Sequence, residues 1–96
     1  MRCAGELRLD QGAVDVLVNK NASLLPIGVK AVSGVFNRGE VVACLAPGGA
    51  EIARGLVNYS SEETRKIMGR PSSELESVLG YVDEPELIHR DNLVLV

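Results

Sequence analysis

The most suggestive chemical motif in the sequence is His89-Arg90-Asp91. The same residue types form the catalytic loop of protein kinases, where an Asn five residues after the Asp holds a metal ion and a metal-binding Asp-Phe-Gly motif follows. Here Asn92 follows Asp91 directly, and no Asp-Phe-Gly motif comes after it. We therefore interpret residues 89–92 as a tight turn without catalytic chemistry.

Other candidate motifs also lack the spacing that chemistry requires. Pro47-Gly48-Gly49 is not the GxxxxGK[ST] pattern of a phosphate loop, so we expect a hairpin turn there. His89 is the only histidine, and no second His or Cys lies at metal-ligand spacing from it. The paired carboxylates fall at predicted helix starts or in charged loops, where they stabilise the helix or remain in solvent. The residues predict no catalytic, metal-binding or cofactor-binding site, and hence a non-catalytic module.

Composition limits the protein to a small globular class. The 96 residues are 46% hydrophobic and 24% charged, with a net charge of −3, which is enough chain for one domain. No run approaches the ~18 apolar residues of a membrane span, and no secretory signal pattern is present, so the expected compartment is the cytoplasm. Cys3 and Cys44 fit neither a disulfide framework nor a zinc site, and we expect two reduced thiols, with Cys44 packed in a strand.

A basic window is the one feature that favours a ligand. Between Asp15 and Glu40 the chain carries Lys20, Lys30 and Arg38 and no acidic residue. One interpretation is a groove in which these cations and the backbone at a glycine meet phosphates or sugar hydroxyls. The other is an ordinary solvated face, because the whole chain lacks the basic balance typical of nucleic-acid binders. The residues leave both interpretations open.

The elements that must position this window are short strands and a few helices. We predict that Asp10 caps the start of one helix and that Ser60, with Glu63 three positions later, caps the start of a second. Ser73 repeats this capping pattern and predicts a third, shorter helix that ends at Gly80. Residues 24–29 form an apolar loop expected to plug one end of a sheet. The predicted strands are residues 6–9, 31–36, 40–45, 51–59, 86–89 and 93–96. This pattern predicts a mixed α/β, mainly β fold: five to six mostly antiparallel strands curled into a partial barrel, with two to three short helices.

Several sequence strings resemble a known family. They are Asp10-Gln11-Gly12-Ala13, Ser23-Leu24-Leu25-Pro26, Gly34-Val35-Phe36, Leu79-Gly80-Tyr81 and Ile88-His89-Arg90-Asp91-Asn92-Leu93. Together they resemble the PUA domain, a small pseudo-barrel, and in particular the version at the C-terminus of the bacterial glutamate 5-kinase family. The resemblance implies that residues 5–96 are a PUA domain, that residues 1–4 are a chain start or linker remnant, and that the parent kinase domain is absent from this sequence.

The resemblance also implies partners and a function. The parent would phosphorylate glutamate for proline synthesis, with ATP and Mg expected only in the absent kinase domain, so this chain alone is expected not to be an enzyme. By similarity to PUA domains of RNA-modifying enzymes, the expected partner is structured RNA, bound at Lys20, Lys30, Gly34 and Arg38. The alternative is a regulatory or structural module that contacts the kinase domain of the same parent chain and modulates its oligomerisation or its feedback inhibition by proline.

Overall fold

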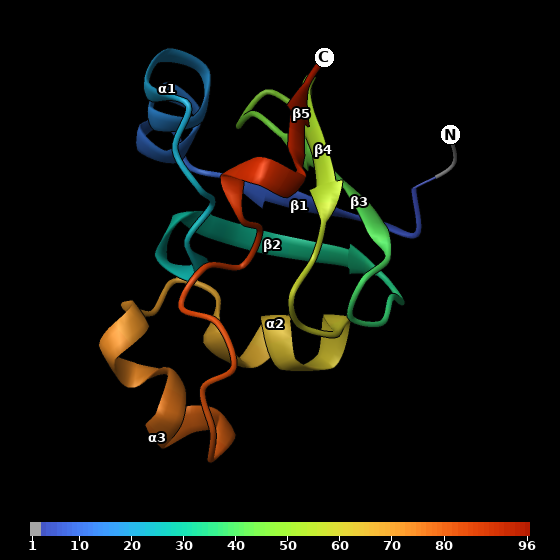
Figure 1. Cartoon of the computed structure of the whole chain (residues 1–96). Coiled ribbons are helices and arrows are strands. Elements are labelled where there is room, and N and C mark those ends of the chain that lie inside the picture. Colours follow the sequence, from blue (N-terminus) through green and yellow to red (C-terminus); the bar gives the residue numbers. More distant parts are fainter. Residues whose placement is uncertain (1–2) are drawn as a thin grey trace.

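The fold is a five-stranded mixed sheet with helices on two sides, seen in a computed structural model that describes residues 3–96 (Figure 1). α1 lies at one side of the sheet, and α2 and α3 lie at the other. Three 3-10 turns, η1 to η3, join these elements. In chain order the elements are β1 (Gly5–Leu9), α1 (Gln11–Lys20), η1 (Pro26–Gly28), β2 (Val29–Gly34), β3 (Val41–Leu45), β4 (Glu51–Leu56), α2 (Ser61–Ile67), η2 (Ser72–Glu74), α3 (Leu75–Leu79), η3 (Arg90–Asn92) and β5 (Leu93–Leu95).

The strands lie in the order β2-β1-β3-β4-β5. The β1–β2, β3–β4 and β4–β5 pairs are antiparallel, which confirms the predicted mainly antiparallel sheet, whereas β1 and β3 run parallel at its centre. β3 and β4 form the expected hairpin. In its turn the Gly49 N–H donates to the Ala46 carbonyl, and the Ala46 N–H donates to the Ala50 carbonyl.

One face of the sheet carries the core. Alternate residues of β1 are buried, as the polar-apolar alternation of residues 6–9 predicts. Tyr59 and Phe36 are the two largest fully buried side chains. Cys44 lies buried in β3, as predicted, and its burial raises the pKa of the thiol to about 12, so this sulfur acts as a packing group.

Local side chains begin two helices as the sequence predicts. The Asp10 carboxylate accepts a hydrogen bond from the Ala13 N–H at 2.7 Å, and Asn21 ends α1 in the left-handed conformation with φ of 50°. Ser60 and Glu63 form the expected capping box of α2. The same prediction at Ser73 is wrong. Residues 72–74 form the 3-10 turn η2, in which the Leu75 N–H donates to the Ser72 carbonyl, and α3 begins without a side-chain cap.

The strand boundaries depart from prediction in three places. Residues 86–89 are not a sixth strand: only Ile88 forms a bridge, with Leu24. Pro26, two residues after Leu24, has no N–H to extend the pairing. β2 begins two residues earlier than predicted. It also ends two residues earlier, because Gly34 at φ of 86° turns the chain out of the sheet. β4 ends at Leu56, after which the chain leaves β3 and the Asn58 N–H donates to the Leu87 carbonyl.

The first residues of the chain are only partly described. Met1 and Arg2, part of the predicted linker remnant, lie outside the described residues. Ala4 donates its N–H to the Val41 carbonyl at 2.8 Å and so adjoins the sheet. Among residues 3–96, no helix is both long and apolar enough to cross a bilayer.

Candidate ligand-binding groove

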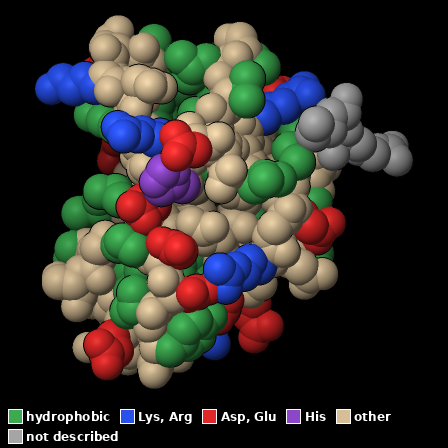
Figure 2. Space-filling view, viewed as in Figure 1, with side chains coloured by type: hydrophobic (Ala, Val, Ile, Leu, Met, Phe, Trp, Pro, Cys, Tyr) green, Lys and Arg blue, Asp and Glu red, His purple; other side chains and the backbone are tan. Residues whose placement is uncertain are grey.

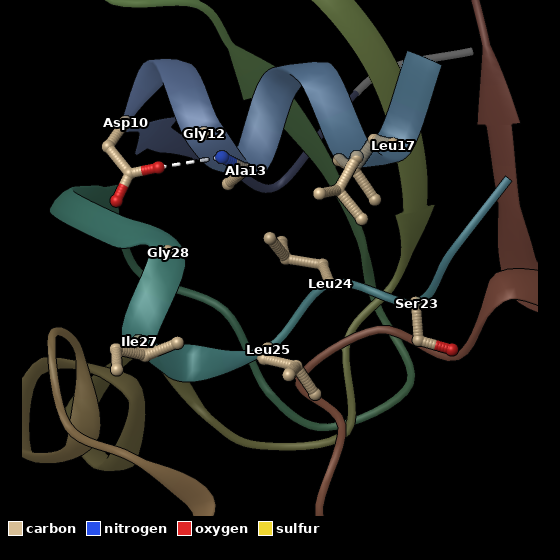
Figure 3. Close-up of a pocket in the computed structure, with 10 residues that line it drawn as sticks. Asp10, Gly12, Ala13, Leu17, Ser23, Leu24, Leu25, Ile27 and Gly28 are labelled. Atoms are coloured by element: carbon tan, nitrogen blue, oxygen red, sulfur yellow. Dashed lines mark hydrogen bonds between the residues drawn. The ribbon is translucent and has the colours of Figure 1, made fainter. Parts of the chain in front are cut away.

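An open groove of about 340 Å³ runs between α1 and residues 23–28, the segment that leads into β2 (Figure 3). Leu17 of α1 and Leu24 of the segment point toward one another across it and are both almost fully buried. The full lining is Asp10, Gly12, Ala13, Val16, Leu17, Ser23, Leu24, Leu25, Ile27 and Gly28.

The groove is narrow at its Gly28 end because the backbone there touches α1. A Cβ placed on Gly28 would lie 2.6 Å from the Ala13 Cβ, so only glycine permits this approach. The Asp10 N–H donates to the Gly28 carbonyl at 2.9 Å, which ties the start of α1 to the end of η1. Pro26 at the start of η1 fixes the backbone that leads into this contact. Local backbone geometry therefore fixes how narrow the groove is at this end.

The groove offers mainly aliphatic surface. Leu25 and Ile27 are 41% and 50% exposed. The prediction that residues 24–29 plug one end of the sheet is therefore correct only for the buried members of this segment, such as Leu24 and Val29. Asp10 is the only charged lining residue, and one of its carboxylate oxygens is occupied by the helix cap. The Ser23 hydroxyl accepts a hydrogen bond from the Arg90 N–H at 3.0 Å. The groove suits an apolar or flat aromatic group better than a small anion.

Two of the four residues predicted to bind RNA lie within three positions of lining residues in the chain, although neither lines the groove itself. Lys20 is the exposed last residue of α1, three positions after the lining residue Leu17. Lys30 is exposed two positions after Gly28 and is the extra residue of a β-bulge. Its neighbours Val29 and Ala31 pair with consecutive residues of β1, so Lys30 itself has no strand partner. The bulge directs Lys30 to solvent at the start of β2.

The other two predicted residues lie elsewhere. Gly34 is four residues beyond Lys30, about 13 Å along β2. The backbone at Gly34 lies against the start of β1: a Cβ there would lie 2.9 Å from the Ala4 carbonyl oxygen and 3.0 Å from the Gly5 Cα. Arg38, in the loop between β2 and β3, forms an ion pair with Asp83. The basic window therefore does not converge on one place.

The surface charge agrees with this separation. On the face shown in Figure 2, Lys and Arg side chains are scattered among Asp and Glu and form no continuous basic area. The sequence pattern did not identify Leu25 and Ile27 as exposed side chains that line the groove. Both belong to the apolar run around Pro26, which could have indicated a binding surface. The run alone does not show which of its side chains α1 covers. Among residues 3–96, no cluster of three or more His, Cys, Asp or Glu residues is placed to hold a metal ion.

Comparison with known proteins decides the family. The model of the PUA domain family matches residues 5–79. The chain belongs to the PUA domain family. A PUA domain from Aeropyrum pernix K1, solved as a tartrate complex, superposes with a TM-score of 0.63 at 23% identity, covering 90% of this chain and 41% of that one. The archaeal box H/ACA sRNP Nop10-Cbf5 complex gives a TM-score of 0.60 at 20% identity, covering 92% of this chain and 26% of that one. These structures confirm the PUA fold.

Closer relatives of this PUA domain carry the name glutamate 5-kinase. That of Stutzerimonas stutzeri (strain A1501) is 62% identical over all 96 residues, and that of Nitrosospira multiformis is 60% identical over the same length. The chain spans about a quarter of each relative, 26% of its length. The sequence resemblance is thus confirmed over the whole chain. The PUA domain alone is not the catalytic part of such a protein.

Proposed function

We propose that this PUA domain is a non-catalytic accessory domain of a glutamate 5-kinase and binds structured RNA at the groove between α1 and residues 23–28. The observation that carries the proposal is an open aliphatic groove whose two lining segments each continue into an exposed lysine, Lys20 at the end of α1 and Lys30 two residues after Gly28. Proteins read RNA mainly at unpaired bases, which offer flat faces for van der Waals contact while the flanking phosphates meet cations. The parent activity, ATP-dependent phosphorylation of glutamate in the cytoplasm, is part of this proposal and rests on the relatives' name.

The proposed site differs from the one the sequence suggested. Lys20 and Lys30 stay in the proposal, since both are exposed and follow lining residues of the groove by two or three positions. Gly34 and Arg38 are left out of it, because the Gly34 carbonyl accepts a hydrogen bond from Arg65 at 2.9 Å and Arg38 is paired with Asp83. With only two cations, RNA binding is expected to be weak and sensitive to salt.

A titration with bulk tRNA at several salt concentrations tests the proposal. Two lysines that neutralise two phosphates predict a slope of log K against log salt of about −1.4. Lys30→Gln should weaken binding and reduce that slope by about 0.7. Arg38→Gln removes the same charge away from the groove and is the matched control, expected to bind as the unmodified chain does.

Two results would count against an RNA site at the groove. The first is no binding at low salt, where the electrostatic attraction is strongest. The second is an equal loss in Lys30→Gln and Arg38→Gln, which would show that the RNA responds only to the overall charge of the domain.

A second candidate function is a regulatory module that acts through protein contact and modulates the oligomerisation or proline feedback of the parent kinase. The aliphatic lining favours it, because the exposed Leu25 and Ile27 could equally hold an apolar side chain of the kinase domain. In a full-length relative, Leu25→Ser would then change kinase kinetics or proline inhibition, whereas Lys30→Gln would not. RNA binding by the isolated domain would be absent.

A further inference from the structure

The strand β5 forms an unprotected edge of the sheet. It pairs with β4 on one side and has no partner strand on the other among the described residues. Val94, Leu95 and Val96 are 67%, 45% and 69% exposed, which is unusual for consecutive aliphatic residues at the end of a sheet. Natural proteins commonly protect such edges with a bulge, a charge or a covering helix.

The opposite edge shows that protection. β2 carries a bulge and a charged side chain at Lys30, and Arg65 of α2 donates to the Gly34 carbonyl at its other end. β5 has regular pairing and carries no charged residue, proline or bulge. The contrast between the two edges indicates that something covers β5.

The free backbone groups of β5 point to another strand. The Val96 N–H donates to the Ile52 carbonyl of the sheet, so the alternating pattern directs the Leu95 N–H and carbonyl to the open edge. The Leu93 carbonyl faces the same way, whereas the Leu93 N–H is already bonded to the Arg90 carbonyl. The free donor, the Leu95 N–H, and the free acceptor, the Leu93 carbonyl, are two residues apart, which is the spacing that an identical antiparallel strand presents. In such a pair, the Leu95 N–H of each copy would donate to the Leu93 carbonyl of the other copy.

The side chains beside this edge would be buried by the same pairing. Val94 faces outward with Leu56, Val41 and Val96, and these four aliphatic residues form the β5 patch. Together with Gly55, Asn92 and the charged Arg54 and Asp91, they line a groove of about 530 Å³. A two-fold axis at Val94 places the strand beside its own copy, so a strand that carried charged side chains would repel its copy. β5 itself is uncharged, so Val94 and its copy at the axis bring no like charges together. Of the two charged residues that line the groove, Arg54 is paired with Glu51 and Asp91 lies in η3, before the strand.

We propose that β5 is a homodimer interface, through which two copies of this chain join their sheets antiparallel with the two Val94 side chains adjacent at the two-fold axis. This interface shares no lining residue with the groove between α1 and residues 23–28, so it is independent of the proposed function. A strand of three residues gives a small interface, and the dimer is expected to form in the micromolar to millimolar range.

Sedimentation velocity over a wide range of protein concentration tests the dimer. The expected result is a concentration-dependent dimer that Val94→Lys abolishes, because two lysines would meet at the axis. Val35→Lys is the matched control: Val35 is 84% exposed in the loop after β2, so this change adds the same charge and removes the same apolar surface away from the edge. Circular dichroism of both variants confirms that the fold is intact.

Amide hydrogen exchange then distinguishes strand pairing from any other association. The Leu95 N–H should exchange freely at low concentration and become protected as the dimer forms. A chain that stays monomeric at every concentration would overturn the proposal, as would a dimer that Val94→Lys leaves intact or one in which the Leu95 amide gains no protection.

Discussion

Gly28 determines how closely α1 approaches the segment that leads into β2. Its backbone lies where a Cβ would be 2.6 Å from the Ala13 Cβ, and its carbonyl accepts the hydrogen bond of the Asp10 N–H. A single missing methyl group thus sets the width of the candidate groove at one end. No charge or hydrogen-bonding side chain is involved in this contact.

Gly28→Ala is expected to destabilise the fold by about 1–3 kcal/mol, because α1 must move away to relieve the overlap. Urea unfolding measures this change. Gly48→Ala is the control, since no atom lies within 4 Å of the position its added methyl group would take and its φ is not positive. It should change stability by no more than about 0.5 kcal/mol. Equal effects of the two substitutions would show that the contact between Gly28 and Ala13 is not tight.

At the scale of elements, identical capping patterns have different outcomes. Ser60 caps α2 and accepts a hydrogen bond from the Glu63 N–H at 3.2 Å. Ser73 has the same kind of sequence around it, yet it lies exposed in η2, and α3 begins after it without a side-chain cap. The difference arises from Pro71, which precedes a tight turn whose backbone groups bond to one another.

Ser60→Ala is expected to cost about 1 kcal/mol, the usual contribution of a helix cap. For a domain of this size such a loss lowers the Tm by about 4–8 °C, which differential scanning calorimetry resolves. Ser73→Ala should leave the Tm close to that of the unmodified chain. A similar decrease in both variants would mean that Ser73 does cap a helix in solution.

At the scale of the whole molecule, the buried Tyr59 binds the segment between α3 and β5 to the core. The Tyr59 hydroxyl donates to the Glu84 carbonyl and accepts a hydrogen bond from the Glu84 N–H. Asn58 adds a side-chain bond to the Glu86 carbonyl at 3.0 Å, and Arg38 pairs with Asp83. These contacts fix the return of the chain across the core to β5.

Tyr59→Phe keeps the buried ring but removes both bonds to Glu84, and it is expected to cost about 1 kcal/mol. Amide exchange should become faster in residues 82–86 and remain unchanged in β1 and β3, because the rest of the core is retained. Tyr81→Phe, which removes an exposed hydroxyl bonded to Glu63, is the control and should change stability little. Uniformly faster exchange across the sheet in Tyr59→Phe would instead show a global loss of stability.

The sequence by itself determined the features that depend on neighbouring residues. The cap at Asp10, the capping box at Ser60, the left-handed Asn21 and the hairpin at residues 46–50 follow from interactions within four residues. The alternation in β1 and the family strings were likewise sufficient for the mainly β fold and the PUA domain. Local propensity and side-chain periodicity act over one turn or one strand, which is the range that a sequence pattern covers.

Only the tertiary structure decided which residues meet. It placed β1 parallel to β3, paired Arg38 with Asp83 and removed residues 86–89 from the sheet, all through contacts between distant segments. It also bonded the Gly34 carbonyl to Arg65, away from the groove, and among the described residues it left β5 with a free edge. The order of strands and the neighbours of a side chain are set by packing of the whole core, and spacing along the chain carries no direct record of either.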